Sequence, residues 1–336
     1  MEKYKIFVGI DISKSWIDVA VLGEGLSAHR NFGNNKKEYK LMLSWLKTFV
    51  KANEMLLCME HTGVYGLPLW NYLTVHNIPF VVESGLQIKL SMGIRRGKSD
   101  KADAQIIARY IKLHHTETKL HKVPEQIISR LKVVFGYRER LVKIKHQLAV
   151  ANKEIKGFMS MDLCKEMSHE SKTLVKIIDN RIAKAEKLIL SILLSDAATK
   201  QIYQLITSVP GIGLISATYM IIVTQNFTVI TNSRKLSRYG GMSPEKNESG
   251  KIKRKEKVSN IGNKKLKALL SNCVGTNLRY DAETKEYYQR KLLEGKPEGV
   301  VINNLKNKIL HRVYAVVNRG TNFVNIKKYA QAGKVA

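Results

Sequence analysis

The sequence is short of acidic residues. Among its 336 residues, 28 are Asp or Glu and 57 are Lys or Arg, which gives a formal net charge of +29 at pH 7. A chain with this excess repels itself unless a polyanion neutralises it, and the candidate polyanions are nucleic acid and an anionic membrane. The charge balance therefore indicates a nucleic-acid-binding or membrane-surface protein.

Long apolar runs are also missing. No stretch reaches the roughly 18 uncharged apolar residues that a membrane-spanning helix needs. The charged N-terminus leads into a strand pattern, unlike a signal peptide. We therefore expect a nucleic-acid partner, no membrane partner, and a location in the bacterial cytosol, associated with the nucleoid.

Cysteine is scarce as well. Cys58, Cys164 and Cys273 stand alone, with no CxxC pair and no Cys/His cluster, which excludes a disulfide framework and a zinc knuckle. The 44% of hydrophobic residues is nevertheless enough to bury a core. At roughly 100 to 200 residues per domain, the length predicts two or three domains.

Residues 1–122 have the pattern of an α/β domain. Apolar residues alternate over 4–22 with a break at 13–15, which predicts two strands joined by a turn. The spacing then predicts a helix over 35–50, a strand over 55–59, a helix over 67–73, a strand over 80–83 and a helix that begins near Ser99. This order indicates a sheet that is at least partly parallel.

Beyond Pro124, helical spacing replaces the alternation. Apolar residues from Ile127 to Phe158 follow three-four spacing, which is typical of a coiled-coil seam, and a second helix is predicted near 170–194. We expect residues 123–197 to form a helical spacer, as an antiparallel hairpin or as an intermolecular arm. Because the seam is longer than one hairpin needs, we expect a homo-oligomer, either a dimer or a tetramer.

Residues 198–336 are predicted to be mostly helical. The segment Ser208–Gly213 precedes an apolar helix, as in a helix-hairpin-helix turn whose backbone amides face a phosphate. Nine Lys or Arg and three Glu lie between Gly241 and Leu270, so positive charge is concentrated there. We expect, in order, a helix over 214–223, a loop over 237–263, and helices near 264–279, 283–293 and 300–318.

Four carboxylates form a candidate metal site. Asp11 and Glu60 end predicted strands, whose carboxyl ends open onto one crevice in a parallel sheet. Asp100 and Asp103 share one face at a predicted helix start. Grouped carboxylates repel one another unless a divalent cation lies between them, and oxygen ligands suit Mg²⁺ or Mn²⁺, which can assist phosphodiester displacement. The alternative is that Asp100 only caps its helix and that the strand-end carboxylates are only solvated.

Seven sequence blocks resemble those of one protein family. They are Gly9–Lys14, Glu60–Tyr65, Lys98–Ala104, Ser208–Gly213, Tyr239–Pro244, Glu248–Lys251 and Gly262–Asn263. In this order they resemble the DEDD insertion-sequence transposases of the IS-one-ten and IS-eleven-eleven group, over nearly the whole chain. His61 departs from the pattern, since a smaller residue is commoner there.

The resemblance implies a RuvC-like N-terminal domain with an RNase H fold, and a C-terminal transposase domain over 198–336. Such proteins are similar to recombinases that act as oligomers on an element end and a target DNA, guided by a structured noncoding bridge RNA. The resemblance also implies that a serine matching Ser249 attacks DNA to form a 5′-phosphoserine. The carboxylates that it implies as catalytic metal ligands match Asp11, Glu60, Asp100 and Asp103.

The residues around Ser249 fit this role without requiring it. A serine hydroxyl needs a base, a metal or strong positive potential to become a nucleophile. The alternatives are that Ser249 serves only the turn, that Tyr239 is the nucleophile, that the carboxylates activate water in a RuvC-like junction nuclease, and that the protein is a non-catalytic scaffold.

Basic residues flank both candidate sites and are expected to bind the phosphate backbone. Such contacts give affinity without sequence choice, which is compatible with a guide RNA that reads the sequence. The expected nucleic-acid-binding residues, with a glycine that permits close approach, are Arg95, Arg96, Lys98, Lys101, Gly250, Lys251, Lys253, Arg254, Lys255, Lys257, Lys264 and Lys265.

Overall fold

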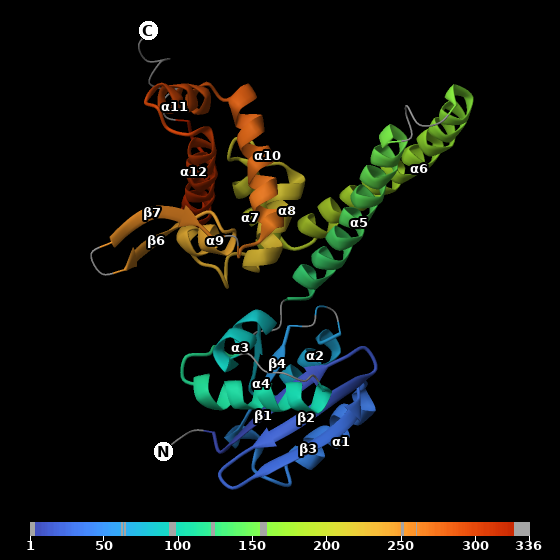
Figure 1. The fold of residues 1–336 in the computed structure, drawn as a ribbon, viewed down its shortest axis with the longest axis vertical. Helices are drawn as coiled ribbons and strands as arrows, with labels where there is room; N and C mark the ends of the chain where they lie inside the picture. The colour runs from blue at the N-terminus through green and yellow to red at the C-terminus, as the bar shows by residue number, and fades with distance from the viewer. Residues whose placement is uncertain are drawn as a thin grey trace. The chain divides into compact units, whose positions relative to one another are not determined.

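The chain divides into two compact units, residues 1–123 and 124–336. The structure is a computed structural model that describes residues 4–61, 63, 65–93, 99–121, 125–154, 160–249, 252–259 and 261–325, with the backbone alone at 152–153, 245–249 and 252–257 (Figure 1).

The N-terminal unit contains a five-stranded sheet with the order β3-β2-β1-β4-β5. The first three strands form an antiparallel meander, and β4 and β5 continue the sheet in parallel with β1. The predicted α/β domain with a partly parallel sheet is therefore confirmed. The strands are β1 (Ile6–Ile12), β2 (Trp16–Leu22), β3 (Ser27–Gly33), β4 (Met55–Glu60) and β5 (Phe80–Glu83).

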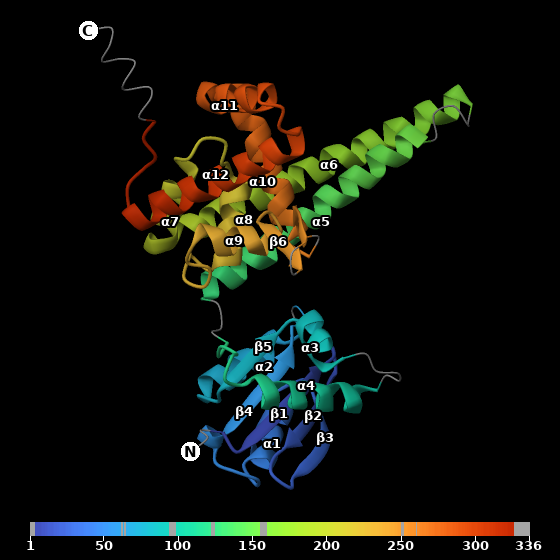
Figure 2. The ribbon, with the colours of Figure 1, turned by 60° about the vertical axis from the view of Figure 1, so that its left-hand side comes forward.

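Alternation along β1 gives the sheet two different faces. Ile6, Val8 and Ile10 face a core that includes side chains of α1 (Lys36–Leu46) and α2 (Leu67–Val75). On the opposite face, Phe7 packs with α3 (Gly85–Met92) and α4 (Asp100–His114). Figures 1 and 2 both show α4 lying along β1 and β2.

The sequence analysis missed β3 and α3. In β3, only two of seven residues are buried, because it is an edge strand that leaves most of its side chains in solvent. In α3, only Ile88 is buried, so its apolar residues show no helical stripe. Pattern analysis detects a buried face, and these two elements present little of one.

The C-terminal unit is mostly helical, as predicted. Its core combines side chains of α7, α8, α10 and α12 with one end of both α5 and α6. Residues 123–197 therefore share a core with 198–336, and their standing as a separate domain stays a prediction. The helices are α5 (Gln126–Glu154), α6 (Met161–Leu194), α7 (Ala197–Thr207), α8 (Leu214–Thr224), α9 (Ser233–Tyr239), α10 (Lys264–Tyr280), α11 (Ala282–Leu293) and α12 (Glu298–Arg319).

Helices α5 and α6 form an antiparallel hairpin within the chain, one of the two arrangements expected (Figure 2). Ion pairs join Arg138 to Glu186 at 2.9 Å and Lys145 to Asp179 at 2.6 Å. The second helix begins at Met161, about nine residues earlier than predicted, because its first half lacks the regular apolar stripe on which the prediction rested.

The expected loop over 237–263 is wrong. The segment contains the end of α9 and an antiparallel hairpin of β6 (Pro244–Ser249) and β7 (Ile252–Val258). At the base of the hairpin, a Cβ on Gly262 would lie 2.6 Å from the backbone nitrogen of Gly241. The strands escaped detection because Lys and Glu dominate them, which hides the alternation that a half-buried strand shows.

None of the described helices is long and apolar enough to cross a membrane. None of the three described cysteines forms a disulfide: Cys58 and Cys273 are buried and Cys164 is half-buried.

Substituting Gly9 with valine is expected to destabilise the N-terminal unit. A Cβ at this position would lie 2.1 Å from the carbonyl oxygen of Ala104 and 2.2 Å from the amide nitrogen of Ala108. Because the neighbours are backbone atoms that cannot turn aside, Gly9→Val should lower the free energy of unfolding by about 3 kcal/mol, measured by urea denaturation.

The control for this substitution is Gly275→Ala in α10, where an added Cβ meets nothing within 4 Å. This change should stabilise the helix by up to about 1 kcal/mol. An unchanged unfolding midpoint for Gly9→Val would contradict the close approach of α4 to β1.

Candidate active site

Carboxylates occupy the carboxyl ends of three adjacent parallel strands. Ile10 pairs with Met59, so Asp11 and Glu60 follow at the next position, and Glu60 pairs with Glu83. An even number of positions separates Asp11 from Phe7, Glu60 from Cys58 and Glu83 from Val81. These three apolar side chains lie on the face of the sheet that α3 and α4 cover. Because strand side chains alternate, all three carboxylates lie on that face.

Small residues bring the start of α4 over this row. Ala20, Ala104 and Ala108 form a small buried cluster, and Gly9 leaves the space through which α4 contacts β1. Gly9 meets Ala104 and Ala108, while Phe7 packs with Ile107 and Ile111 further along the helix. The helix therefore runs antiparallel to β1, which directs its first turn toward Asp11.

That first turn contains Asp100 and Asp103. The helix begins where Ser99 caps it, with the Ser99 hydroxyl accepting a hydrogen bond from the Ala102 amide at 3.2 Å. The sequence prediction of a helix start near Ser99 is therefore confirmed. Because Ser99 fills the capping role, Asp100 and Asp103 are left available for other contacts.

The electrostatics of Asp11 show that the four predicted carboxylates lie near one another. Burial, followed by the charges of Asp103, Asp100 and Glu60 in that order, raises the pKa of Asp11 from 3.8 to about 6, against a hydrogen bond from the Ile12 backbone. As the described side chains lie, no three of His, Cys, Asp or Glu are gathered tightly enough to hold a metal ion. The structure thus shows neighbouring carboxylates without a closed ligand shell.

Glu60 is positioned by the absence of a side chain at Gly85. A Cβ on Gly85 would lie 2.1 Å from Oε1 of Glu60, so the carboxylate rests directly on the first turn of α3. Helix N-termini favour negative charge because their amides and dipole are positive there. The sequence analysis did not identify Gly85, whose role depends on a contact between distant segments.

Glu83 is a fifth carboxylate, which the sequence analysis did not single out. It accepts hydrogen bonds from the Ser84 amide at 2.9 Å and from the Tyr110 hydroxyl at 3.3 Å. Burial and the Glu83 charge raise the pKa of Tyr110 and of Cys58 to about 12 each. The signal was present in the sequence, because Glu83 ends the next predicted strand in the manner of Glu60.

Asp18 is the cross-strand neighbour of Asp11 on β2, but its surroundings differ. It accepts hydrogen bonds from Asn31 Nδ2 at 2.9 Å and contacts His29 Nε2 at 2.9 Å. Of these two adjacent aspartates, Asp18 therefore has local partners, whereas Asp11 faces mainly other carboxylates. This contrast separates a structural carboxylate from a candidate ligand.

The second predicted centre lies in the C-terminal unit. Ser249 ends β6 and pairs with Ile252 of β7, so the serine stands at the tip of the hairpin. Among the basic residues predicted beside it, Lys253, Arg254, Lys255 and Lys257 lie along β7. Predicted residues that fall outside the described part of the chain are Arg95, Arg96, Lys98, Gly250 and Lys251.

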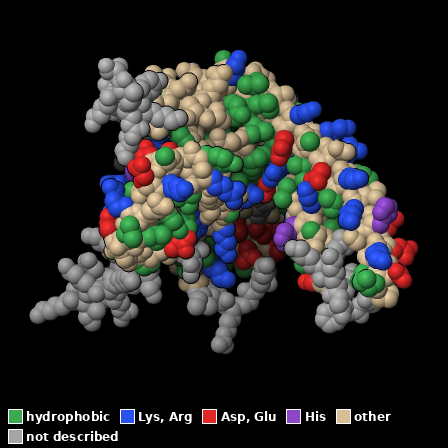
Figure 3. Space-filling view, turned by 90° about the horizontal axis from the view of Figure 1, so that it is seen from above, with side chains coloured by type: hydrophobic (Ala, Val, Ile, Leu, Met, Phe, Trp, Pro, Cys, Tyr) green, Lys and Arg blue, Asp and Glu red, His purple; other side chains and the backbone are tan. Residues whose placement is uncertain are grey.

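The remaining predicted cations differ in exposure and pairing. Lys101 on α4 and Lys264 on α10 are exposed, whereas Lys265 forms an ion pair with Glu139 of α5. The rival nucleophile Tyr239 was expected to pack, but its side chain is 43% exposed and its hydroxyl accepts a hydrogen bond from Asn263 Nδ2. Lys and Arg side chains are spread across the face shown in Figure 3.

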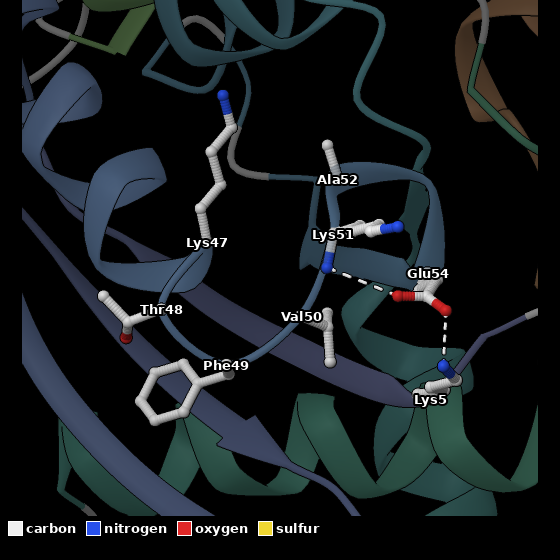
Figure 4. A pocket seen from close by; sticks show the side chains of 8 residues that line it. All are labelled: Lys5, Lys47, Thr48, Phe49, Val50, Lys51, Ala52 and Glu54. Carbon is white, nitrogen blue, oxygen red and sulfur yellow. Dashed lines mark hydrogen bonds and ion pairs between the residues drawn. The ribbon is translucent and has the colours of Figure 1, made fainter.

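A pocket of about 620 Å³ lies elsewhere on the N-terminal unit (Figure 4). Lys5, which precedes β1, forms an ion pair there with Glu54, which precedes β4. The pocket is therefore at the end of the strands opposite to Asp11 and Glu60. Its lining consists of Lys5, Lys47, Thr48, Phe49, Val50, Lys51, Ala52 and Glu54.

Replacing Asp11 with asparagine should stabilise the metal-free protein at neutral pH. A folded-state pKa of about 6 against an ordinary 3.8 means that stability is lost as the pH rises from about 4 to 6. Asp11→Asn should recover roughly 1 to 2 kcal/mol at pH 7.5, after allowance for solvent screening, and nothing at pH 3.5. Thermal unfolding in EDTA at both values measures this difference.

The matched control is Asp18→Asn, which replaces a carboxylate in its hydrogen bonds with His29 and Asn31. This variant should be less stable than the wild type at pH 7.5. Equal effects of the two substitutions would mean that the charges around Asp11 do not repel one another as the geometry indicates.

Comparison with known proteins finds two family models that match successive parts of the chain. Residues 8–154 match a family model of DEDD transposases of IS110 type, described as "Transposase". Residues 203–289 match a second model, described as "Transposase IS116/IS110/IS902 family".

Individual relatives are distant but extensive. The chain is 24% identical over 330 residues to the "Pilin gene-inverting protein" of Moraxella lacunata, covering 95% of this chain and 98% of that protein. A Moraxella bovis protein with the same description is 23% identical over 328 residues, with the same two shares covered. An "Insertion element IS110 uncharacterized 43.6 kDa protein" of Streptomyces coelicolor is 24% identical over 116 residues, covering 34% of this chain and 29% of that protein.

Among solved structures, T. thermophilus RuvC in complex with a Holliday junction substrate shows 12% identity and a TM-score of 0.28, covering 35% of this chain and all of the RuvC chain. The two family models match in order, the first over the strands and helices that carry the carboxylates and on through α5, the second over the segment that includes the hairpin. The chain therefore belongs to the IS110 family of DEDD transposases.

Proposed function

We propose that this transposase cuts and rejoins DNA by transesterification, with Ser249 as the nucleophile and Asp11, Glu60, Asp100 and Asp103 as the metal ligands. The observation that carries the proposal is the group of carboxylates around Asp11, whose charges repel one another and raise the pKa of Asp11. Like charges held close together destabilise a fold. An arrangement of this kind therefore does not serve stability alone.

The donor set fits a hard divalent cation. The four residues offer only carboxylate oxygens, which suit Mg²⁺ or Mn²⁺ better than softer metals. When bound, such an ion stabilises the charge on the attacking and leaving oxygens of a phosphodiester displacement. The protein contributes the positioning, through Gly9 beneath α4 and Gly85 beneath Glu60.

Ser249 supplies the covalent step in this proposal. Its hydroxyl oxygen attacks a DNA phosphorus, the serine proton passes to a base or to solvent, and the bond to the 3′-oxygen breaks. The 3′-oxygen takes up a proton and leaves as a free hydroxyl, while the 5′-phosphate stays on the serine. Attack by another 3′-hydroxyl reverses the step, so rejoining needs no nucleotide cofactor.

The two halves of the proposed site lie in different units of the chain, so we propose that they meet in a homo-oligomer. Exposed apolar side chains on the α5–α6 hairpin support self-association, among them Ile144, Leu174 and Ile177, which are 45%, 48% and 53% exposed. Burying such residues between copies would remove apolar surface from water.

We also propose the partners. An element end and a target DNA are the substrates, and a structured noncoding RNA selects the target by base pairing. The net charge of +29 supports a polyanionic partner without distinguishing RNA from DNA. The relatives described as pilin gene-inverting proteins make inversion of a DNA segment one outcome to be expected of this chemistry.

Ser249→Ala should abolish a covalent protein–DNA adduct. The assay incubates the full-length protein, with its co-purified RNA, Mg²⁺ and labelled element-end DNA, and resolves the products by denaturing gel electrophoresis. Asp103→Asn should lose the adduct as well, because it removes a carboxylate from the proposed ligand set. Both losses should exceed about 100-fold, typical for removal of a catalytic group.

The control is Ser243→Ala, which changes a serine at the base of the same hairpin and should keep the adduct. Cleaved DNA ends without any adduct in the wild type would instead support the water-using nuclease. Intact activity in both the Ser249 and the Asp103 variants would support a non-catalytic nucleic-acid-binding protein.

Gly85→Ala should impair the reaction without unfolding the protein. The added methyl group displaces the Glu60 carboxylate, while alanine suits the first turn of a helix. Adduct formation should fall by at least about tenfold, the equivalent of 1.4 kcal/mol in the barrier, with the melting temperature retained. Gly299→Ala, in the open first turn of α12, is the control and should match the wild type in both measurements.

A further inference from the structure

The first turn of α10 is unusually basic for a helix N-terminus. Lys264, Lys265 and Lys267 occupy it, and no acidic residue does. The positive end of the helix dipole favours anions and disfavours lysine. Glu139 forms an ion pair with Lys265, but no described carboxylate forms one with Lys264 or Lys267. These two lysines therefore add positive charge to the end of the helix where the dipole is already positive.

A buried lysine on a separate helix adds to this charge. Lys306 of α12 is only 7% exposed, and among the described residues its ammonium group has no ion-pair or hydrogen-bond partner. Burial, followed by the charge of Lys267, lowers the pKa of Lys306. The charge of Lys267 on α10 thus acts on Lys306 of α12, and no described carboxylate forms an ion pair with either of them. Lysines this deeply buried are rare unless they are paired.

The pair is fixed to the base of the β6–β7 hairpin. Nζ of Lys267 donates a hydrogen bond to the carbonyl oxygen of Gly241 at 3.4 Å. On α12, Asn303 and Asn307 flank Lys306 and donate to the carbonyl oxygen of Met242 at 2.8 Å and 3.3 Å. Gly241 and Met242 lie just before β6, the strand that ends at Ser249.

We propose that Lys267, in the first turn of α10, and Lys306, on α12, form a binding site for a backbone phosphate of the nucleic acid that this unit engages. This inference rests on the proposed function only in its choice of nucleic acid as the source of the phosphate. A phosphate there supplies the negative charge that the protein itself does not provide.

The chemistry favours a phosphate over a purely structural role. A structural buried lysine normally donates to a carboxylate or to several carbonyl groups, because an unpaired buried charge destabilises the fold. Phosphate oxygens can accept from both ammonium groups and from the helix N-terminus at once. Because this position is at the base of the hairpin, it would hold one nucleic-acid strand a fixed number of residues away from Ser249.

The test uses the full-length protein and measures the salt dependence of its affinity for a labelled DNA duplex by fluorescence anisotropy. The double variant Lys267→Met/Lys306→Met should make the negative slope of log K against log[NaCl] shallower by about 0.9, the value for one phosphate contact in duplex DNA. Lys291→Met is the control, since Lys291 already pairs with Glu294 at 2.6 Å, and it should leave the slope unchanged.

Two further measurements complete the test: the melting temperature of the variant and its stabilisation by inorganic phosphate. Lys306→Met alone should keep or raise the melting temperature, and inorganic phosphate should stabilise the wild type more than this variant at matched ionic strength. A well-folded variant with the wild-type salt slope and the wild-type phosphate response would overturn the proposal, as would a large loss of stability on Lys306→Met.

Single-stranded RNA of equal length identifies which nucleic acid occupies the site. A change in slope on DNA alone, on RNA alone or on both supports the phosphate site and names its occupant. Because binding needs no chemistry, a missing Ser249 adduct together with a reduced slope would reject the proposed mechanism and leave the phosphate site standing.

Discussion

The close contact between α4 and β1 is the constraint on which the N-terminal unit depends. Gly9 allows the helix backbone to rest on the strand, and Ala20, Ala104 and Ala108 keep the seam narrow. The same contact directs the first turn of α4 toward the end of β1, where Asp11 lies. Packing and the proposed function are thus coupled, since the small residues at this contact also hold like charges together against their repulsion.

Much of this arrangement could be predicted from the sequence, because strand ends and helix starts have clear signals. Asp11 and Glu60 follow apolar strand patterns, and Ser99 marks the start of α4. What could not be predicted depends on contacts between distant segments. Nothing in the local pattern distinguishes Gly85 from another helix-start glycine, or Lys306 from the many other lysines of the chain.

The hairpin of the C-terminal unit is a second feature that the sequence pattern could not predict. A segment rich in Lys and Glu has no apolar alternation, so β6 and β7 resemble a loop in the sequence. Backbone pairing, the contact between Gly241 and Gly262, and the asparagines of α12 define the structure instead. These determinants lie on three separate parts of the chain.

The raised pKa of Asp11 also has a consequence for how a cation enters the site. With a value of about 6, this carboxylate is mostly ionised at neutral pH, so a divalent ion bound there as proposed would displace few protons from it. In mildly acidic surroundings the ion and the proton compete for the same oxygens. Under the proposed function, occupancy of the site by the cation would depend on pH at the lower end of the physiological range and become independent of pH above neutrality.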